Sequence, residues 1–271
     1  MTRWHPGLYV VATPIGNLDD FSPRAAEVFR QAAVIAAEDT RTSGALIRRA
    51  GSGARMVSLT EHNVEQRIPE LLSAAREGIV VLVSDAGTPA IADPGARLVS
   101  AAHSARVAVF TVPGPSALAA AISVAGFDAG PFVFLGFLPR PRGARLRELT
   151  GAAPGGGVVI FFESPTRLPA TLAEVGDLFG DPETVVCREL TKVHEETVRG
   201  RASDLARRFA TARGECTVLV QVPPRDGTQS AAELMAAMHR AGARQSAAAA
   251  EVARLTGITR DQAYGLWPPD S

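Results

Sequence analysis

The chain is 271 residues long and carries 28 Lys and Arg side chains against 28 Asp and Glu, so its formal net charge is zero. This length is enough for two compact domains, or for one large domain with an appendage. The zero net charge excludes tight binding of nucleic acid through a general basic excess, so any contact with RNA must come from local basic patches.

Neither a membrane span nor a secretion signal is indicated. No apolar run reaches the roughly 18 residues of a membrane-spanning helix, and the N-terminus lacks the apolar core and cleavage site of a signal peptide. The two cysteines, Cys187 and Cys216, both lie in apolar runs, which predicts buried thiols rather than a disulfide or a metal site. We therefore expect a cytoplasmic protein.

In the first half of the chain, short apolar runs alternate with segments of helical spacing. A helix is expected to begin at Ser22 and Pro23, an N-cap followed by proline at the first helical position; another ends at Gly51, and a third covers residues 64–77. Further helices are predicted from about residues 93 and 115. The predicted strands are residues 8–15, 33–38, 56–59, 79–85 and 107–112.

The second half begins near Pro131 with further strands, followed by a linker at residues 223–229 and an Ala-rich helical tail. Helices are expected to begin near residues 164 and 203. The strands are predicted at residues 132–138, 157–164, 184–190 and 215–222. The strand–helix alternation predicts an α/β fold with a mostly parallel sheet. We place two α/β domains at residues 1–127 and 128–224, and a small helical module at 225–271.

Four of the predicted strands end in loops of unusual composition, at residues 13–20, 84–95, 112–117 and 161–167. Ligands of open parallel sheets bind beyond the carboxyl ends of the strands. Gly and Pro in such loops let the backbone approach a ligand closely and expose N–H groups. Each loop alone is equally compatible with a tight turn, but the four together favour a binding site.

Several common kinds of site are not indicated. The chain has neither the G-x-G-x-x-G pattern after a strand nor the G-x-x-x-x-G-K-[ST] pattern, which disfavours hydride transfer and phosphoryl transfer. The His and Cys residues do not have the spacing of a zinc site, so no metal is expected. A G-x-S-x-G nucleophile elbow is also missing.

The motifs TPIGNL, AEDTR, SDAGTPAIADPG, PGPSAL, GFLPR, FFESPTRL and RELTK occur in this order. Together they resemble the tetrapyrrole-methylase-like superfamily, whose members are class III S-adenosylmethionine methyltransferases. Within it they look most like the bacterial 16S ribosomal RNA (cytidine-2′-O)-methyltransferases, over about residues 8–222. Tetrapyrrole methylases open with a G-x-G-P-G-D loop where this chain has TPIGNLDD, which argues against that branch.

This resemblance implies two α/β domains with S-adenosylmethionine in the cleft between them. The loop at residues 85–93 would face the methionine and sulfonium, although Asp93 is equally typical of a helix N-cap. The residues implied to contact the cofactor are Pro14, Gly16, Asp85, Ala86, Gly87, Thr88, Ile91, Asp93, Pro113, Gly114, Pro115, Ser116, Phe161, Phe162, Cys216 and Thr217.

The implied reaction is attack of a ribose 2′-oxygen on the methyl group. Positioning of the two reactants contributes roughly 7–11 kcal/mol in such reactions, and a general base adds roughly 10²–10⁴-fold. The candidate catalytic residues are Asp39, Glu163, Glu189 and Lys192; Lys192, the only lysine in the chain, would need desolvation to be neutral. We favour Glu163 or Lys192 without choosing between them.

The implied partner is 16S rRNA or the assembled small ribosomal subunit, and superfamily members commonly form homodimers. The tail resembles a helix-turn-helix-like module that could grip RNA, or it is an Ala-rich cap on the domain. The candidate RNA contacts are Arg24, Arg41, Arg140, Arg142, Arg145 and Arg167, any of which can equally be structural.

Two alternatives remain open. The first is another methyltransferase of the superfamily, acting on a tetrapyrrole of the precorrin type or in the diphthine pathway. The TPIGNL loop and the helical tail speak against it. The second is a non-catalytic protein that binds RNA or the ribosome and keeps only the methylase fold, because fold does not guarantee function.

Overall fold

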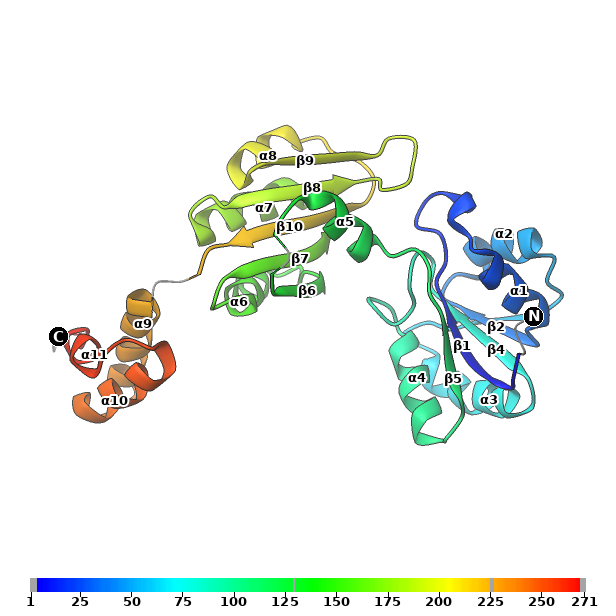
Figure 1. The fold of residues 1–271 in the computed structure, drawn as a ribbon, viewed down its shortest axis with the longest axis horizontal. Helices are drawn as coiled ribbons and strands as arrows, with labels where there is room; N and C mark the ends of the chain where they lie inside the picture. Colours follow the sequence, from blue (N-terminus) through cyan, green and yellow to red (C-terminus); the bar gives the residue numbers. More distant parts are fainter. Residues whose placement is uncertain (1–3, 129, 225–226, 269–271) are drawn as a thin grey trace.

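The computed structural model describes residues 4–128, 130–224 and 227–268. The described chain forms two five-stranded sheets, each with helices on both faces, and a group of helices at the C-terminus (Figure 1). No helix among the described residues is both long and apolar enough to cross a membrane.

The first sheet is parallel throughout and has the order β3-β2-β4-β1-β5. Its strands are β1 (Gly7–Val11), β2 (Val34–Ala37), β3 (Arg55–Ser58), β4 (Ile79–Val83) and β5 (Val109–Val112). All residues of β2 and β4 are buried, as expected for parallel strands covered on both faces. The predicted parallel sheet is confirmed.

Two layers of helices cover this sheet. α1 (Pro23–Gln31) and α2 (Thr40–Ala50) pack on one face, where Phe29 and Leu46 join Tyr9 and Val11 in one core. α3 (Val64–Glu77) and α4 (Gly95–Ser104) cover the other face, where the core includes Leu8. These two cores hold the carboxyl ends of the strands at one edge, where the sequence places its unusual loops.

Local chemistry fixes the helix ends of this part. The Ser22 hydroxyl accepts a hydrogen bond from the N–H of Ala25, with Pro23 at the first helical position. Gly51 ends α2 in the left-handed conformation, with φ 68°, and α3 has the predicted bounds. β1 stops at Val11 instead of residue 15.

The second sheet is mixed, with the order β6-β7-β10-β8-β9. Only the pair β6 and β7 is parallel. Its strands are β6 (Phe132–Phe137), β7 (Gly157–Glu163), β8 (Glu183–Arg188), β9 (Glu196–Arg201) and β10 (Cys216–Val222). The sequence analysis missed β9, an edge strand that alternates between exposed and half-buried residues and contains one large apolar residue, Val198.

α5 (Ala117–Ala125) lies on one face of the second sheet. α6 (Arg142–Ala152), α7 (Leu168–Phe179) and α8 (Ala202–Arg208) lie on the other. The two free cysteines are buried, as predicted. A short 3₁₀ helix (Leu18–Asp20) lies in the loop after β1.

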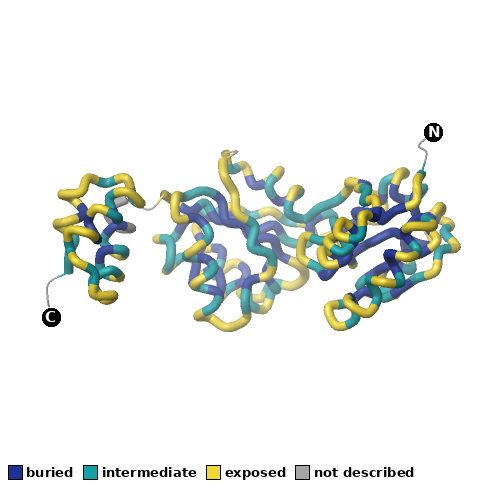
Figure 2. The backbone as a smooth tube through the Cα atoms, turned by 90° about the horizontal axis from the view of Figure 1, so that it is seen from below, coloured by how far each residue is buried: buried dark blue, intermediate teal, exposed yellow. Residues whose placement is uncertain are grey.

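The C-terminal tail has its own small core. It comprises α9 (Gly227–Arg240), α10 (Gln245–Thr256) and α11 (Arg260–Gly265), which bury Met235, Ala249 and Val252 among themselves. A capping box between Thr259 and Gln262 starts α11. Both views show the tail standing apart from the sheets (Figures 1 and 2).

Candidate active site

A cavity of about 480 Å³ lies where the strand ends of the two sheets meet. The first sheet contributes the segments that follow β1, β2, β4 and β5. The second contributes the ends of β6 and β7, parts of β8 and the start of β10. The site therefore lies at the carboxyl edge of the parallel sheet, where open α/β folds bind ligands.

The structure brings most of the cofactor-facing candidates together in this cavity. The predicted residues that line it are Asp85, Ala86, Gly87, Thr88, Ile91, Asp93, Ser116, Phe162, Glu163, Cys216 and Thr217. Six other candidates lie outside the lining: Pro14, Gly16, Pro113, Gly114, Pro115 and Phe161. Of these, Phe161 is fully buried in the core between the second sheet and the helices α6, α7 and α8, so its side chain cannot close over a ligand.

Hydrogen bonds connect the cavity-lining loops of the first sheet to one another. The N–H of Thr13 donates to the carbonyl of Gly87 at 2.9 Å, and the N–H of Gly87 donates back at 3.1 Å. The Thr88 hydroxyl donates to the carbonyl of Pro115 at 3.1 Å. Gly87 has φ 78°, and a Cβ there would lie 3.2 Å from Ile15. Glycine is therefore required at this close crossing.

Asp93 serves the local fold. Its carboxylate accepts hydrogen bonds from the N–H groups of Ala90 and Gly95, both at 2.8 Å. Ala90 has φ 67°, an unusual left-handed conformation for a residue with a Cβ. Asp93 thus holds a strained turn at the cavity wall, and α4 begins at Gly95, two residues after it.

Asp39 is engaged outside the cavity. It is the N-cap of α2, and its carboxylate accepts from the N–H and the guanidinium of Arg41. The Arg41 hydrogen bonds lower the pKa of Asp39 to about 2. The N–H of Asp39 donates to Asp85 at 2.8 Å. Asp39 therefore helps to fix Asp85, while its own carboxylate is a poor proton acceptor.

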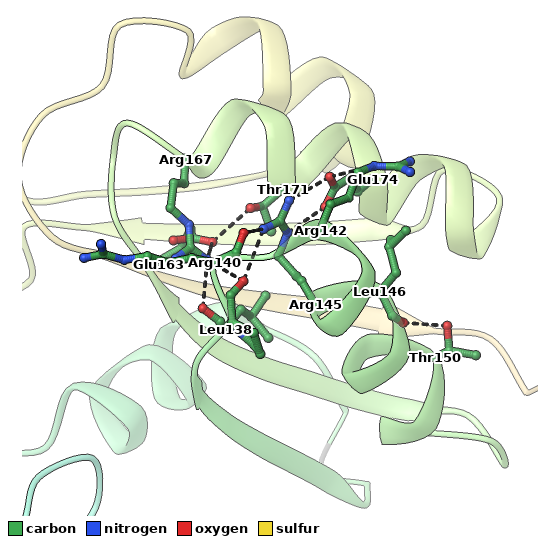
Figure 3. A network of polar contacts seen from close by, with 11 residues as sticks. Leu138, Arg140, Arg142, Arg145, Leu146, Thr150, Glu163, Arg167, Thr171 and Glu174 are labelled. Carbon is green, nitrogen blue, oxygen red and sulfur yellow. Dashed lines mark hydrogen bonds and ion pairs between the residues drawn. The ribbon is translucent and has the colours of Figure 1, made fainter.

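Glu163 is buried at the end of β7 and is fully engaged (Figure 3). One carboxylate oxygen accepts from the N–H of Ser164 at 2.7 Å. The other accepts from the Arg167 guanidinium and from the Thr171 hydroxyl, both at 2.9 Å. Arg167 also donates to the carbonyl of Leu138, so the pair fastens the loop after β6 to β7.

Among the candidate RNA-binding arginines, Arg145 does not have the exposed position that contact with RNA requires. Its side chain is buried and forms an ion pair with Glu174, and it also donates to the carbonyls of Pro139 and Arg140 (Figure 3). The hydrogen bond from Arg145 lowers the pKa of Glu174 below its ordinary value. Arg145 therefore shapes the loop and cannot reach RNA, whereas Arg140 and Arg142 are exposed.

The other two candidates, Arg24 and Arg41, lie on the first sheet's side and also outside the cavity lining. Arg24 donates to the carbonyl of Thr111 at 2.6 Å. Both residues are exposed, so they remain accessible to a large substrate.

Lys192 forms a polar cluster with two carboxylates beside the cavity. Its ammonium donates to Glu189 at 2.8 Å and to Glu215 at 3.0 Å. Burial alone would lower the pKa of Lys192, but these hydrogen bonds outweigh burial and raise it. Lys192 therefore stays charged, and hydrogen bonding to it lowers the pKa of Glu189. Neither side chain lines the cavity, although Glu215 does.

The turn that carries this cluster crosses closely over the loop after β1. A Cβ on Gly16 would lie 2.4 Å from Cγ of Lys192 and 2.9 Å from the Thr191 hydroxyl. Glu189 and Thr191 both have positive φ, at 52° and 66°. Strained conformations of this kind persist only where the surroundings stabilise them. At this crossing, the turn from the second sheet lies directly against the loop after β1 of the first sheet.

The sequence analysis missed several lining residues. They are Ile15, Glu38, Ser84, Ala92, Ala117, Phe137, Ser164, Pro165, Cys187, Leu190, Gly214 and Glu215. Most of them stand next to a predicted residue or inside a quoted motif, so the motif boundaries were a usable signal. Glu38 is the residue directly before Asp39, and burial, followed by the charges of Asp85, Asp93 and Glu61, raises its pKa.

All charged side chains in the cavity lining are acidic. They are Glu38, Asp85, Asp93, Glu163 and Glu215. Glu163 is paired with Arg167, and Glu215 with Lys192. The other three form no ion pair with any residue that the structure describes. The cavity thus has a net negative charge, which favours a cation and disfavours a phosphate.

Phe137 is an exposed aromatic residue at the edge of this cavity. Its side chain is 67% exposed, and its ring centroid lies 5.3 Å from that of Phe162. The register of β6 against β7 shifts between Phe134 and Phe137, and Gly136 has φ 64°. Such bulges redirect side chains near functional sites, and this one turns Phe137 toward the cavity.

A family model and individual relatives assign the chain to the same family of proteins. Residues 7–206 match the model of the tetrapyrrole (corrin/porphyrin) methylases. The chain is 41% identical over 265 residues to ribosomal RNA small subunit methyltransferase I of Micromonospora olivasterospora, covering 95% of this chain and 85% of that protein. It is 42% identical over 216 residues to the protein of the same name from Thermotoga maritima, covering 79% and 97%.

A solved structure shares the fold. The uroporphyrin-III C-methyltransferase of Thermus thermophilus, solved in complex with S-adenyl homocysteine, superposes with a TM-score of 0.56 at 19% identity, covering 79% of this chain and 97% of that one. The family model and the curated relatives together place the chain: it belongs to the tetrapyrrole methylase family and, within it, to the ribosomal RNA small subunit methyltransferase I family.

Proposed function

We propose that this protein uses S-adenosylmethionine to methylate the ribose 2′-hydroxyl of a cytidine in the 16S rRNA of the small ribosomal subunit. The names of the relatives support a methyltransferase that acts on small-subunit rRNA. The finer assignment, to the ribose oxygen of a cytidine, rests on the motifs TPIGNL and SDAGTP in this sequence.

The observation that carries the proposal is the acidic cavity between the sheets. S-adenosylmethionine has a positive sulfonium, and an ammonium that its carboxylate balances, so its net charge is positive, and it has no phosphate. Glu38, Asp85 and Asp93 supply negative charge without basic partners among the described residues, and charges act strongly where water is partly excluded. The fit is chemical: a cationic cofactor gains from this lining, whereas a dinucleotide would be repelled.

The remaining lining suits the uncharged parts of the cofactor. Ile91 and Phe162 offer apolar contact, and the hydroxyls of Ser116 and Thr217 offer hydrogen bonds. When bound, S-adenosylmethionine supplies a methyl group whose bond to sulfur breaks with the electron pair left on sulfur, while the ribose oxygen forms the new bond. The protein's own residues hold the reactants and exclude water from the cavity.

Phe137 offers a place for the substrate at the edge of the cavity. An exposed aromatic face can stack with an unpaired nucleobase, as in sequence-specific RNA recognition. The exposed Arg140, three residues further on, can neutralise a phosphate outside the acidic cavity. This arrangement separates the anionic RNA backbone from the cationic cofactor.

The resemblance also implies that the protein acts as a homodimer in the cytoplasm. Because the net charge is zero, unaided binding to naked RNA is expected to be weak. We therefore propose the assembled small subunit as the preferred substrate.

The test uses purified protein, tritium-labelled S-adenosylmethionine, and either small subunits or naked 16S rRNA from cells that lack the enzyme. Label in an alkali-resistant dinucleotide is expected, because a 2′-O-methyl group blocks alkaline cleavage, and digestion to nucleosides should give a methylated cytidine. Label in an alkali-labile product would contradict the ribose assignment. Cofactor binding without labelled RNA would favour a tetrapyrrole substrate or a non-catalytic role.

A further inference from the structure

Glu38 occupies a distinctive position in the cavity. It follows β2 directly, next to the end of β4, because Ala37 pairs with Val83 in the sheet. It lines the cavity and is half-buried. Its carboxylate forms no hydrogen bond and no ion pair with any residue that the structure describes, although it lies beside the loop that begins at Asp85.

The other carboxylates and the lysine near the cavity are all engaged. Asp39 is bound by Arg41, and Glu163 by Arg167 and Thr171. Glu189 and Glu215 share the ammonium of Lys192. A proton acceptor needs an accessible lone pair within reach of the substrate. Of the other lining carboxylates, Asp85 accepts from the N–H of Asp39, and Asp93 accepts from those of Ala90 and Gly95. Among the carboxylates that line the cavity, only Glu38 therefore has no hydrogen bond or ion pair with a described residue.

We propose that Glu38 is the general base that accepts the proton of the ribose hydroxyl during methyl transfer. This inference rests on the proposed function. The proton of the 2′-hydroxyl passes to a carboxylate oxygen of Glu38, and the electron pair of the broken O–H bond remains on the ribose oxygen, which uses it for the new bond to the methyl carbon. Glu38 becomes a neutral acid and later releases the proton to water.

The surroundings of Glu38 suit a base. Burial raises its pKa, and so do the charges of Asp85 and Asp93 from the loop after β4, and of Glu61 from the turn after β3. The basic groups of the neighbouring elements are paired with other carboxylates: Arg97 of α4 lies 4.0 Å from Glu61, and Arg41 is bound to Asp39. A carboxylate with a raised pKa takes up a proton more readily than an ordinary one.

The experiment compares Glu38→Gln with Glu38→Asp and with Glu77→Gln, a matched control at the exposed end of α3. Single-turnover methylation of small subunits is measured at saturating cofactor across pH, and the Kd for S-adenosylmethionine is measured by calorimetry. The rate of E38Q is expected to be roughly 10²–10⁴-fold lower than that of the wild type. The wild-type rate should rise with pH as Glu38 loses its proton, and this rise should be absent in E38Q. E38D should retain part of the rate and part of its pH dependence, and E77Q should retain the full wild-type rate and pH dependence.

A second readout needs no activity. In cofactor-free protein labelled with ¹³C at the glutamate carboxyl carbons, the Glu38 signal, assigned by its loss in E38Q, is expected to titrate above the ordinary value of 4.5. A Glu38 pKa at or below that value would overturn the proposal.

The outcomes separate this inference from the proposed function. Wild-type methylation of the ribose with an unchanged E38Q rate would overturn the role of Glu38 and leave the function standing. A weakened Kd with a normal rate at saturation would make Glu38 a counter-charge for the cofactor and also overturn the base. No ribose product from the wild type would overturn both.

Discussion

Arg145 and Glu174 are 29 positions apart in the chain, yet their side chains form a two-point ion pair with contacts of 2.7 and 2.8 Å. Both side chains are about 10% exposed. The pair joins α6 to α7 and fixes the carbonyls of residues 139 and 140. The loop that follows Phe137 thus owes its shape to an arginine that the sequence alone suggested for RNA.

Replacing Arg145 with Ala should destabilise the fold by about 3 kcal/mol, because Glu174 would keep only the exposed Arg142 as a partner and the carbonyls of Pro139 and Arg140 would lose their donor. Urea unfolding measures this. Arg142→Ala is the matched control, since Arg142 contacts the same carboxylate at 3.2 Å but is 69% exposed; it should cost about 1 kcal/mol or less. Equal losses in the two variants would contradict a special role for the buried pair.

The same pair predicts a pH dependence. Folding lowers the pKa of Glu174, so its contribution to stability is present above the unfolded value and is lost as pH falls through the folded one. The difference in unfolding free energy between wild type and Arg145→Ala should therefore shrink on acidification. A difference that stays constant with pH would argue against the ion pair.

Gly16→Ala should weaken cofactor binding, because the added Cβ would collide with the Lys192 turn and separate the cavity walls. The Kd for S-adenosylmethionine, measured by calorimetry, is expected to rise. Gly44→Ala in α2 is the control: its Cβ meets only the Arg48 side chain, at 3.5 Å. That variant should keep the Kd and gain about 0.5–1 kcal/mol of stability. An unchanged Kd in Gly16→Ala would show that the walls can shift freely.

Phe137→Ala should impair the use of RNA more than the binding of cofactor. Loss of one base–aromatic stack costs about 1–3 kcal/mol, or roughly 5- to 150-fold in kcat/KM for the RNA substrate. Phe132→Ala is the control, because it removes an exposed ring from the same strand that does not line the cavity. If both variants lose equally, general packing of β6 explains the effect and stacking does not.

Cys187 and Cys216 line the cavity but should resist alkylation in the folded protein. Burial raises the pKa of both thiols, that of Cys216 to about 11, and the thiolate is the reactive form. After treatment of the native protein with iodoacetamide at neutral pH, mass spectrometry should find both cysteines unmodified. After denaturation, the same treatment should modify both. Rapid labelling of the native protein would show that the cavity wall opens.

Local signals made much of the fold predictable. α3 has the predicted bounds, and Ser22, Pro23 and Gly51 mark helix ends by conformational preferences that need no distant partner. The edge strand β9 was missed because its residues are mostly polar and solvated on one side, so they lack the apolar run that reveals a buried strand.

The candidate site was less predictable because it depends on contacts between distant parts of the chain. Asp39 and Glu38 are neighbours, but only Glu38 lines the cavity, while Asp39 caps a helix. The burial of Arg145 depends on Glu174, which no local pattern reveals. Motifs located the loops at the sheet edge; which side chains face the cavity is decided by tertiary packing.

Among the residues that the structure describes, the C-terminal helices have a core of their own, in which Met235, Ala249 and Val252 pack with other residues of the tail. Deleting or exchanging such a module removes no member of the four described core clusters of the two α/β units. Gain or loss of the module in evolution is therefore expected to change the stability of the two α/β units little. The Thermotoga maritima relative matches over 97% of its own length but only 79% of this chain, so it is the shorter protein of the two.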